Sequence, residues 1–308
     1  MRDREEERRG EGRASARGLS RRAFLSAGAL FAGLPALRPA LAAPAPARIA
    51  IADWALLETC LALGHAPAAA VELVLFRRYA VEPPVTDAVV DLGLRGSLNF
   101  ELLSLVAPDR IYGSNYSAWA NEQMRRIAPV RELSIYRRGE KPFAKAQGAM
   151  RAMADDLGLA DRAEAYIEAL QAELAAHADA ARRHAGRPLL VINIGDSRHF
   201  RAFGADSMFG EIGERLGFAN AWGPLTRYSA TAPVGVEALA RFPDAIVVIV
   251  SPVPPDARRA LPDSALWQAM PAVKAGRVVT IDPVNPFGGL PAARRFARLL
   301  GQALRELA

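Results

Sequence analysis

Cysteine and histidine are both scarce in this sequence. Cys60 is the only cysteine among 308 residues, which excludes a disulfide bond within the chain. Because Cys60 lies in an apolar helical pattern, we expect it in the core rather than acting as a nucleophile. The four histidines are scattered, whereas sites for bare zinc or manganese need clustered His and carboxylate ligands. Asp196, His199 and Asp206 could be imagined as metal ligands, but we favour a structural loop there.

Sequence motifs of catalysis are also missing. The chain has no Gly-x-Ser-x-Gly elbow with a Ser–His–Asp grouping, no His-Glu-x-x-His pair and no Walker loop. We therefore expect a protein that is not an enzyme, with an exported hydrolase kept as an alternative. A third class, a purely structural interaction protein, would not need a preorganised cleft.

Positive charge is sparse outside the first 42 residues. The formal net charge is +6, but residues 1–42 hold nine of the 39 basic and five of the 33 acidic residues. The remainder carries 30 basic and 28 acidic residues, a net charge of +2. So small an excess argues against nucleic acid as a partner of the folded part.

Residues 1–43 have the pattern of an export signal. Arg21-Arg22 is followed by Ala-Phe-Leu, a weakly apolar run to Leu37 and small residues up to the expected cleavage after Ala42 or Ala43. The paired arginines resemble the twin-arginine signal. The run of about fifteen residues is shorter than the ~20 that span a bilayer, and no other segment approaches that length. We expect an exported protein.

The remaining sequence alternates strand and helix patterns in two blocks, 47–142 and 187–308, with a helical segment at 143–186 between them and no flexible Gly/Ser linker. Such alternation predicts parallel α/β sheets, of about four strands in the first block. Its expected strands are 47–53, 69–75, 89–94, 110–113 and 130–136, and its helices 55–63, 100–106 and 119–127. For the second block we expect strands 189–194, 245–250 and 277–281, helices 208–216, 237–241, 266–273 and 291–307, and a turn-rich loop at 223–234.

A long amphipathic helix is expected at 159–184. Apolar residues recur there at three- and four-residue steps, with no internal Gly or Pro. Asp161 and Glu164 resemble a capping box, and Gly186 can end the helix. At ~1.5 Å per residue it would run roughly 35 Å. We therefore predict an α/β fold of two lobes joined by one long, rigid helix.

Several segments, in this order and spacing, carry a resemblance to a known family. They are Glu82-Pro-Pro-Val-Thr-Asp, Val90-Asp-Leu-Gly-Leu-Arg95, Asn99-Phe-Glu-Leu-Leu, Arg126-Ile-Ala-Pro129, Arg198-His199, Asn220-Ala-Trp222 and Leu266-Trp-Gln-Ala-Met-Pro-Ala-Val-Lys-Ala-Gly-Arg277. Together they resemble the periplasmic ferric-hydroxamate siderophore (ferrichrome-type) binding proteins of ABC iron importers, which belong to the helical-backbone class. The resemblance implies a periplasmic carrier that binds a ferric siderophore in a ligand cleft between the two lobes, with other iron chelates, cobalamin or haem as alternatives.

The resemblance also implies site residues. Arg95 matches the arginine that holds the iron–hydroxamate centre, and Tyr79 and Tyr116 match aromatic residues of the cleft. The second lobe departs from the family pattern, because Tyr228-Ser229 replaces Phe-Trp and Asn285-Pro286-Phe287 replaces Trp-Phe-Tyr. We expect Tyr228 and Phe287 to contact the ligand, and the more polar pocket would suit a larger, a more polar, or a citrate- or carboxylate-type ferric chelate.

The family docks on its permease through one acidic residue on each lobe, and Glu122 and Glu237 match those positions. The resemblance thus implies an inner-membrane ABC permease with its cytoplasmic ATPase as partner. It also implies a monomer without a cofactor other than the ferric chelate that it carries. The stiff helix suggests a small rocking of the lobes on binding rather than a wide closure.

Overall fold

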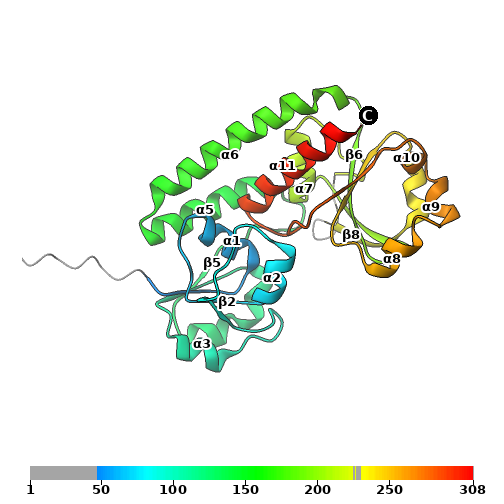
Figure 1. The fold of residues 1–308 in the computed structure, drawn as a ribbon. Coiled ribbons are helices and arrows are strands. Elements are labelled where there is room, and N and C mark those ends of the chain that lie inside the picture. The colour runs from blue at the N-terminus through cyan, green and yellow to red at the C-terminus, as the bar shows by residue number, and fades with distance from the viewer. Residues whose placement is uncertain (1–46, 225, 227–229, 308) are drawn as a thin grey trace, which may run out of the picture. The chain divides into compact units, whose positions relative to one another are not determined.

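Two β-sheets with their surrounding helices make up the folded part of the chain (Figure 1). A computed structural model describes residues 47–224, 226 and 230–307. Residues Pro46–Ala308 form one compact unit. Within it we call each sheet with its helices a lobe, numbered in chain order. The expected leader at 1–43, with its cleavage point, lies outside the described residues.

The sheet of the first lobe is parallel throughout. Its strand order is β3-β2-β1-β4-β5, and every pairing in it is parallel. The predicted parallel α/β lobe is confirmed, with five strands in place of about four. Its elements are β1 (Ile49–Ile51), α1 (Trp54–Ala62), β2 (Ala69–Ala70), α2 (Leu73–Tyr79), β3 (Val90–Asp91), α3 (Phe100–Val106), β4 (Arg110–Gly113), η1 (Asn115–Ala120), α4 (Asn121–Arg125) and β5 (Val130–Glu132).

The strand predicted at 69–75 ends at Ala70, and helix α2 begins at Leu73, so that prediction is wrong beyond Ala70. Leu73 and Phe76 are buried at a three-residue spacing. The Leu73 backbone N–H donates to Asp91 Oδ2 at 3.0 Å. A short apolar run cannot be assigned to strand or helix by periodicity alone, and this helix is stabilised by a side chain distant in the sequence.

The sheet of the second lobe is mixed, with strand order β10-β9-β6-β7-β8. The three strands predicted for this lobe, β10, β9 and β6, are parallel, whereas β7, which was not predicted, pairs antiparallel with β6 and with β8. The elements are β6 (Leu189–Ile194), β7 (His199–Phe203), α7 (Met208–Arg215), β8 (Ala230–Gly235), η3 (Val236–Arg241), β9 (Ile246–Val250), α8 (Pro255–Ala260), α9 (Ala265–Ala269), α10 (Pro271–Lys274), β10 (Val278–Ile281) and α11 (Leu290–Glu306).

Strand β8 lies largely within the segment 223–234 that the sequence predicted as a loop. It contains Pro233, and its register with β7 shifts between Phe200 and Ala202. An edge strand tolerates a proline and an irregular register, because one side of it makes no ladder bonds. The sequence Ala-Thr-Ala-Pro-Val-Gly therefore gave little indication of a strand.

The chain passes between the lobes through α5 (Phe143–Leu157), α6 (Ala160–Ala181) and the short helix η2 (Arg182–His184). Helix α6 has 22 residues, about 33 Å at ~1.5 Å per residue. Its buried face was predicted from the sequence and consists of Ala163, Ile167, Leu170, Leu174 and Ala181.

The predicted capping box of this helix is wrong. Leu159 is the N-cap and makes no side-chain cap bond, while Glu164 accepts from Arg151 Nε at 2.6 Å. The left-handed Gly158 ends α5 directly before Leu159, so α6 starts without a separate capping residue.

Helix α11 packs beside α6 and also contacts α1 and α7 (Figure 1). One continuous apolar cluster runs from the first sheet through α5, α6 and α11 to one face of the second sheet. The lobes therefore share a core in addition to the connecting helix that the sequence predicted. The boundaries at 142/143 and 186/187 stay predictions.

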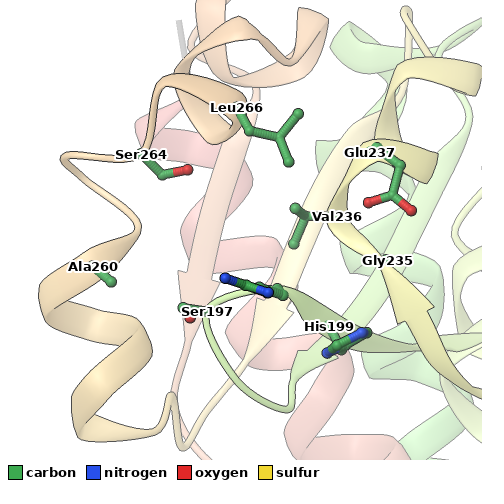
Figure 2. A pocket seen from close by; sticks show the side chains of 9 residues that line it. Ser197, His199, Gly235, Val236, Glu237, Ala260, Ser264 and Leu266 are labelled. Carbon is green, nitrogen blue, oxygen red and sulfur yellow. The ribbon is translucent and has the colours of Figure 1, made fainter.

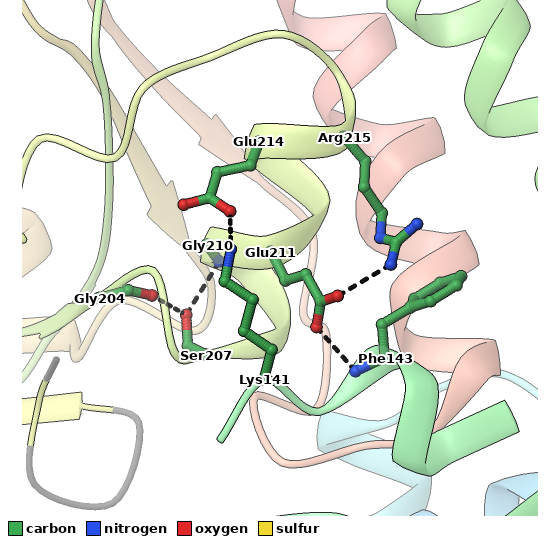
Figure 3. Close-up of polar contacts among 8 residues, drawn as sticks. All are labelled: Lys141, Phe143, Gly204, Ser207, Gly210, Glu211, Glu214 and Arg215. Atoms are coloured by element: carbon green, nitrogen blue, oxygen red, sulfur yellow. Dashed lines mark hydrogen bonds and ion pairs between the residues drawn. The ribbon is translucent and has the colours of Figure 1, made fainter. Parts of the chain in front are cut away.

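Polar contacts also hold the start of α5 to the second lobe (Figure 3). Glu211 of α7 accepts from the Phe143 backbone N–H at 2.8 Å and from Arg215 Nη2 at 2.9 Å. Lys141 pairs with Glu214 one turn further along the same helix. These bonds supply an acceptor for an N-terminal amide of α5 that the helix itself leaves unpaired.

Candidate ligand-binding site

A cavity of about 380 Å³ lies at the carboxyl edge of the first sheet. We call it the Arg95 pocket. Its lining comes from the segments after β1, β3 and β4 and from one distant segment of the chain. The lining residues are Asp53, Trp54, Arg95, Gly96, Tyr116, Trp119 and Phe287. Parallel α/β sheets commonly bind ligands at this edge, because their strands all end there.

Arg95 is fixed in this pocket by Glu72 and by the ring of Trp54. Its Nε donates to Glu72 Oε2 at 2.6 Å, and its backbone N–H donates to Glu72 Oε1 at 3.0 Å. Its guanidinium carbon lies 4.1 Å from the centre of the Trp54 ring. Trp54 is itself held by a bond from Nε1 to the Val71 carbonyl at 3.1 Å. The ion pair uses Nε, so both terminal NH₂ groups remain available to a ligand.

Phe287 follows the last strand of the second lobe but packs on the first. Its ring centre lies 5.6 Å from that of Tyr136 and 6.2 Å from that of Tyr116. The Tyr136 hydroxyl donates to the Gly288 carbonyl at 2.7 Å. The segment 285–289 thus completes a pocket whose other walls belong to the first lobe.

Glu58 of α1 holds the segment 285–289 by two hydrogen bonds. Its two carboxylate oxygens accept from Asn285 Nδ2 and from the Gly289 N–H, both at 2.8 Å. Burial raises the pKa of Glu58 to about 8, because desolvation outweighs these two bonds. A Cβ atom on Gly288 would come within 2.5 Å of Glu58 Oε2, so only glycine fits there. The contact between the lobes is therefore tight at this point.

A second cavity, of about 610 Å³, lies between the lobes. We call it the interlobe cavity. Arg78 and Tyr79 at the end of α2 line it on one side. The second lobe contributes the carboxyl ends of β6, β9 and β10, the start of β7 and part of β8, namely Asn193, Ile194, Gly195, Asp196, His199, Phe200, Arg201, Ala232, Pro233, Ser251, Pro252, Val253, Pro254, Pro255, Val284 and Pro286. Pro286 lines this cavity and Phe287 lines the Arg95 pocket, so the two adjoin at this segment.

Three of the five predicted ligand residues therefore line one pocket, namely Arg95, Tyr116 and Phe287. Tyr79 lines the adjoining interlobe cavity. The fifth, Tyr228, lies outside the described residues. Their contact with a ligand stays a prediction.

The lining residues that the sequence reasoning missed include Trp54, Trp119, Arg78 and Arg201. Trp54 follows directly on the first strand, so the rule on carboxyl ends of strands would have found it. Arg201 had no such signal, because β7 was not predicted.

The two predicted docking glutamates are both exposed, each at the second position of a short helix. Glu122 in α4 accepts from Arg126 Nη2 at 2.6 Å and is 83% exposed. Glu237 in η3 lines a shallow cavity of about 360 Å³ with Ser197 and His199 (Figure 2). The local positions thus correspond in the two halves of the chain.

Other chemistry has little support in the described ranges. Among these residues no group of three His, Cys, Asp or Glu side chains lies close enough to hold a metal ion. Asp196 instead binds His199 Nδ1 at 3.0 Å within its own loop. Cys60 is buried as predicted, and burial raises the pKa of its thiol. No helix in the described part of the chain is long and apolar enough to cross a membrane.

Comparison with known proteins agrees with this architecture. The chain is 33% identical over 287 residues to the iron(3+)-hydroxamate-binding protein FhuD of Escherichia coli (strain K12), covering 93% of this chain and 97% of the relative. The structure of Fe³⁺-Desferal-bound FhuD from Vibrio cholerae matches with a TM-score of 0.80 and 25% identity, covering 85% and 99% of the two chains.

A more distant structure has the same fold. FhuD2 of Staphylococcus aureus with bound ferrioxamine B matches with a TM-score of 0.68 at 16% identity, covering 85% of this chain and 99% of the other. The family model described as periplasmic binding protein matches residues 49–284, most of the chain. The chain therefore belongs to the periplasmic binding protein family.

Proposed function

We propose that this protein binds a ferric siderophore, of the hydroxamate type, and delivers it to an inner-membrane ABC permease driven by a cytoplasmic ATPase. The ligand class is supported by the names of two relatives, the iron(3+)-hydroxamate-binding protein of E. coli and the Fe³⁺-Desferal-bound protein of V. cholerae. Binding and release of cargo require no chemical step in the carrier, in keeping with a protein that is not an enzyme.

The observation that carries this proposal is the fixed guanidinium of Arg95 in an aromatic pocket. A guanidinium stays charged and directs several N–H donors in one plane, which suits the hydroxamate oxygens around ferric iron. Its ion pair with Glu72 and its stacking on Trp54 hold it in place before the ligand arrives. Tyr116, Trp119 and Phe287 offer flat faces and apolar edges to the arms of the chelate.

A titration tests the proposal directly. The purified mature protein is titrated with ferric desferrioxamine B while tryptophan fluorescence is recorded, and ferric chloride, cobalamin and haem serve as competing ligands. We expect saturable quenching by the ferric chelate, because Trp54 and Trp119 line the pocket. Saturation by cobalamin or haem with no response to the ferric hydroxamate would overturn the proposal.

The carrier in this proposal is a monomer without a resident cofactor, and the ferric chelate is its cargo. Native mass spectrometry of the mature protein with ferric desferrioxamine B checks both points. We expect one chain with one chelate and no other bound group. A dimer that persists at submicromolar concentration would contradict the monomer.

Docking on the permease is proposed through Glu122 and Glu237. Two exposed carboxylates on different lobes would pair with basic residues on the two permease halves and so register both lobes at once. An exposed ion pair contributes only ~0–1 kcal/mol, which suits a carrier that must leave after delivery.

Export to the periplasm is proposed to follow the twin-arginine route. The leader carries Arg21-Arg22 ahead of a weakly apolar run, and the family description places its members in the periplasm. Replacing both arginines with lysines is expected to leave the precursor in the cytoplasm. Normal appearance of the mature protein in the periplasm after that change would refute this route.

A further inference from the structure

Two arginines reach the interlobe cavity from opposite lobes. Arg78 lies at the end of α2 in the first lobe, and Arg201 lies on β7 in the second. Both are exposed, and neither forms an ion pair or side-chain hydrogen bond with any residue that the structure describes. Two other arginines of the first lobe do form ion pairs: Arg77 pairs with Asp87 at 2.9 Å, and Arg95 pairs with Glu72. The cavity therefore has a positive group without a counter-charge on each side.

The acidic side chain in this lining, Asp196, is held within its own loop and pairs with neither arginine. Asp196 Oδ1 accepts from the backbone N–H groups of Arg198 at 2.7 Å and His199 at 2.8 Å. The His199 ring nitrogen Nδ1 lies 3.0 Å from both carboxylate oxygens. Because Asp196 is bound within its own loop, Arg78 and Arg201 remain to meet negative charge on a ligand.

The two adjoining cavities are large enough to hold different parts of one ligand. The Arg95 pocket holds about 380 Å³, and the interlobe cavity adds about 610 Å³ beyond Pro286. An iron centre bound at Arg95 would leave its outer groups in the larger space. A carboxylate there meets guanidinium groups, which bind carboxylates in a two-pronged geometry.

We propose, on the basis of the function proposed above, that Arg78 and Arg201 form an anion subsite, and that the ligand is a ferric hydroxamate chelate that also carries free carboxylate. The subsite discriminates among chelates that the Arg95 pocket accepts alike. Exposed charge pairs of this kind contribute up to about fivefold in affinity each, so the two together give at most about twenty-fivefold, and we expect roughly tenfold. The preference weakens with added salt, because salt screens exposed charges.

Three probes that differ only at one end test the proposal. Ferric desferrioxamine B ends in an ammonium group, its N-acetyl derivative ends in a neutral amide, and its N-succinyl derivative ends in a carboxylate. Affinity for each is measured at two salt concentrations for the wild-type protein and for Arg78→Gln, Arg201→Gln and the double variant. Arg77→Gln, one position from Arg78 but outside the lining, is the matched control.

We expect the wild type and Arg77→Gln to bind the succinyl probe about tenfold more tightly than the acetyl probe. In the double variant the ratio of the two affinities should fall to near one, with an intermediate ratio in each single variant. Equal affinity of the wild type for both probes would overturn the subsite and leave the proposed function standing. A preference that survives in the double variant would overturn its assignment to these arginines. Failure of all three ferric probes to bind would overturn the proposed function and the subsite together.

Discussion

The two adjoining cavities differ in how their arginines are held. In the Arg95 pocket the guanidinium is paired with Glu72 at 2.6 Å and stacked on Trp54. In the interlobe cavity neither Arg78 nor Arg201 has a carboxylate partner among the described residues, and the two belong to different lobes; Arg78 lies only against the Tyr79 ring, at 5.6 Å from its centre. The first arrangement is preorganised, whereas the second can adjust when a ligand arrives or the lobes rock.

This difference suggests a division of labour within one cleft. A fixed donor set suits the part of a ligand that does not vary, which in a ferric hydroxamate is the iron centre. Adaptable charges suit the outer groups, which differ from one chelate to another. The rigid pocket gains its last wall from Phe287, through the buried contact of Glu58 with the segment 285–289.

The largest expected effect concerns this buried contact. Burial raises the pKa of Glu58 from 4.5 to about 8. Between these values the folded protein keeps a proton that the unfolded chain has released, so the free energy of unfolding falls as pH rises. The slope from Glu58 is at most about 1.4 kcal/mol per pH unit. Urea unfolding of the wild type from pH 5 to pH 8 measures it.

The variant Glu58→Gln cannot lose a proton, so its stability should depend much less on pH. Asp53, whose pKa is also raised by burial, leaves a residual slope of the same sign. Glutamine offers one acceptor oxygen where Glu58 offers two, so the variant can also differ in stability at every pH. The readout is therefore the slope of the free energy of unfolding against pH, and not its absolute value. The same slope in both proteins would show that Glu58 does not titrate in this window.

The next largest effect is expected at Arg95. The variant Arg95→Ala removes the fixed donor set and should weaken binding of ferric desferrioxamine B at least tenfold, ~1.4 kcal/mol. A fall in Tm is expected as well, because Glu72, whose side chain is only 10% exposed, loses its partner. Fluorescence titration and thermal unfolding measure the two effects.

Arg77→Ala is the control for Arg95→Ala. It removes an arginine and an ion pair from the same lobe, but at a pair whose Asp87 is fully exposed. We expect its affinity and Tm to match those of the wild type. If both variants bind the ferric chelate as the wild type does, the fixed arginine is not the ligand site.

A smaller effect is expected at Phe287, the residue after the last strand of the second lobe that completes the Arg95 pocket. The variant Phe287→Ala removes ring contacts with Tyr136 and Tyr116 and one face offered to the ligand. Each aromatic contact contributes about 0.5–1.5 kcal/mol, so we expect a loss of roughly fivefold in affinity. Phe287→Tyr keeps the ring and should bind normally. Equal affinity in both variants would place the ligand away from this wall.

Much of the fold could be predicted from the sequence, because its patterns are local. The buried face of α6 recurs at three- and four-residue steps, β9 is a continuous apolar run, and β6 is apolar except for Asn193. Helix α2 and strand β8 could not be predicted, because each depends on distant partners. Asp91 binds the first amide of α2, and β8 is defined by its pairing with β7.

The candidate site divides in the same way. Arg95 and Tyr116 follow predicted strands, so the rule on strand ends agrees with the family resemblance there. Phe287 was expected from the family pattern alone. Its attachment to the first lobe depends on Glu58, some 230 residues earlier in the chain, and no local pattern links the two. The two arginines of the interlobe cavity were not predicted to line it. Arg201 in particular lies on a strand, β7, that was not predicted.

The smallest effect on the cleft is expected from the docking glutamates, which extends the comparison from the cavities to an exposed short helix on each lobe. Glu122→Ala and Glu237→Ala should leave the affinity for the ferric chelate unchanged, because neither residue lines the Arg95 pocket or the interlobe cavity. Each variant alone removes an exposed pair of ~0–1 kcal/mol and should slow uptake of the chelate only in part. The double variant should lower uptake well below either single variant, because both lobes lose their register on the permease.

Glu101→Ala, a change at an exposed glutamate of α3, is the control in the same cellular uptake assay. Normal uptake by the double variant would mean that the carrier docks through other residues, and the correspondence of the two short helices would then have no role in delivery.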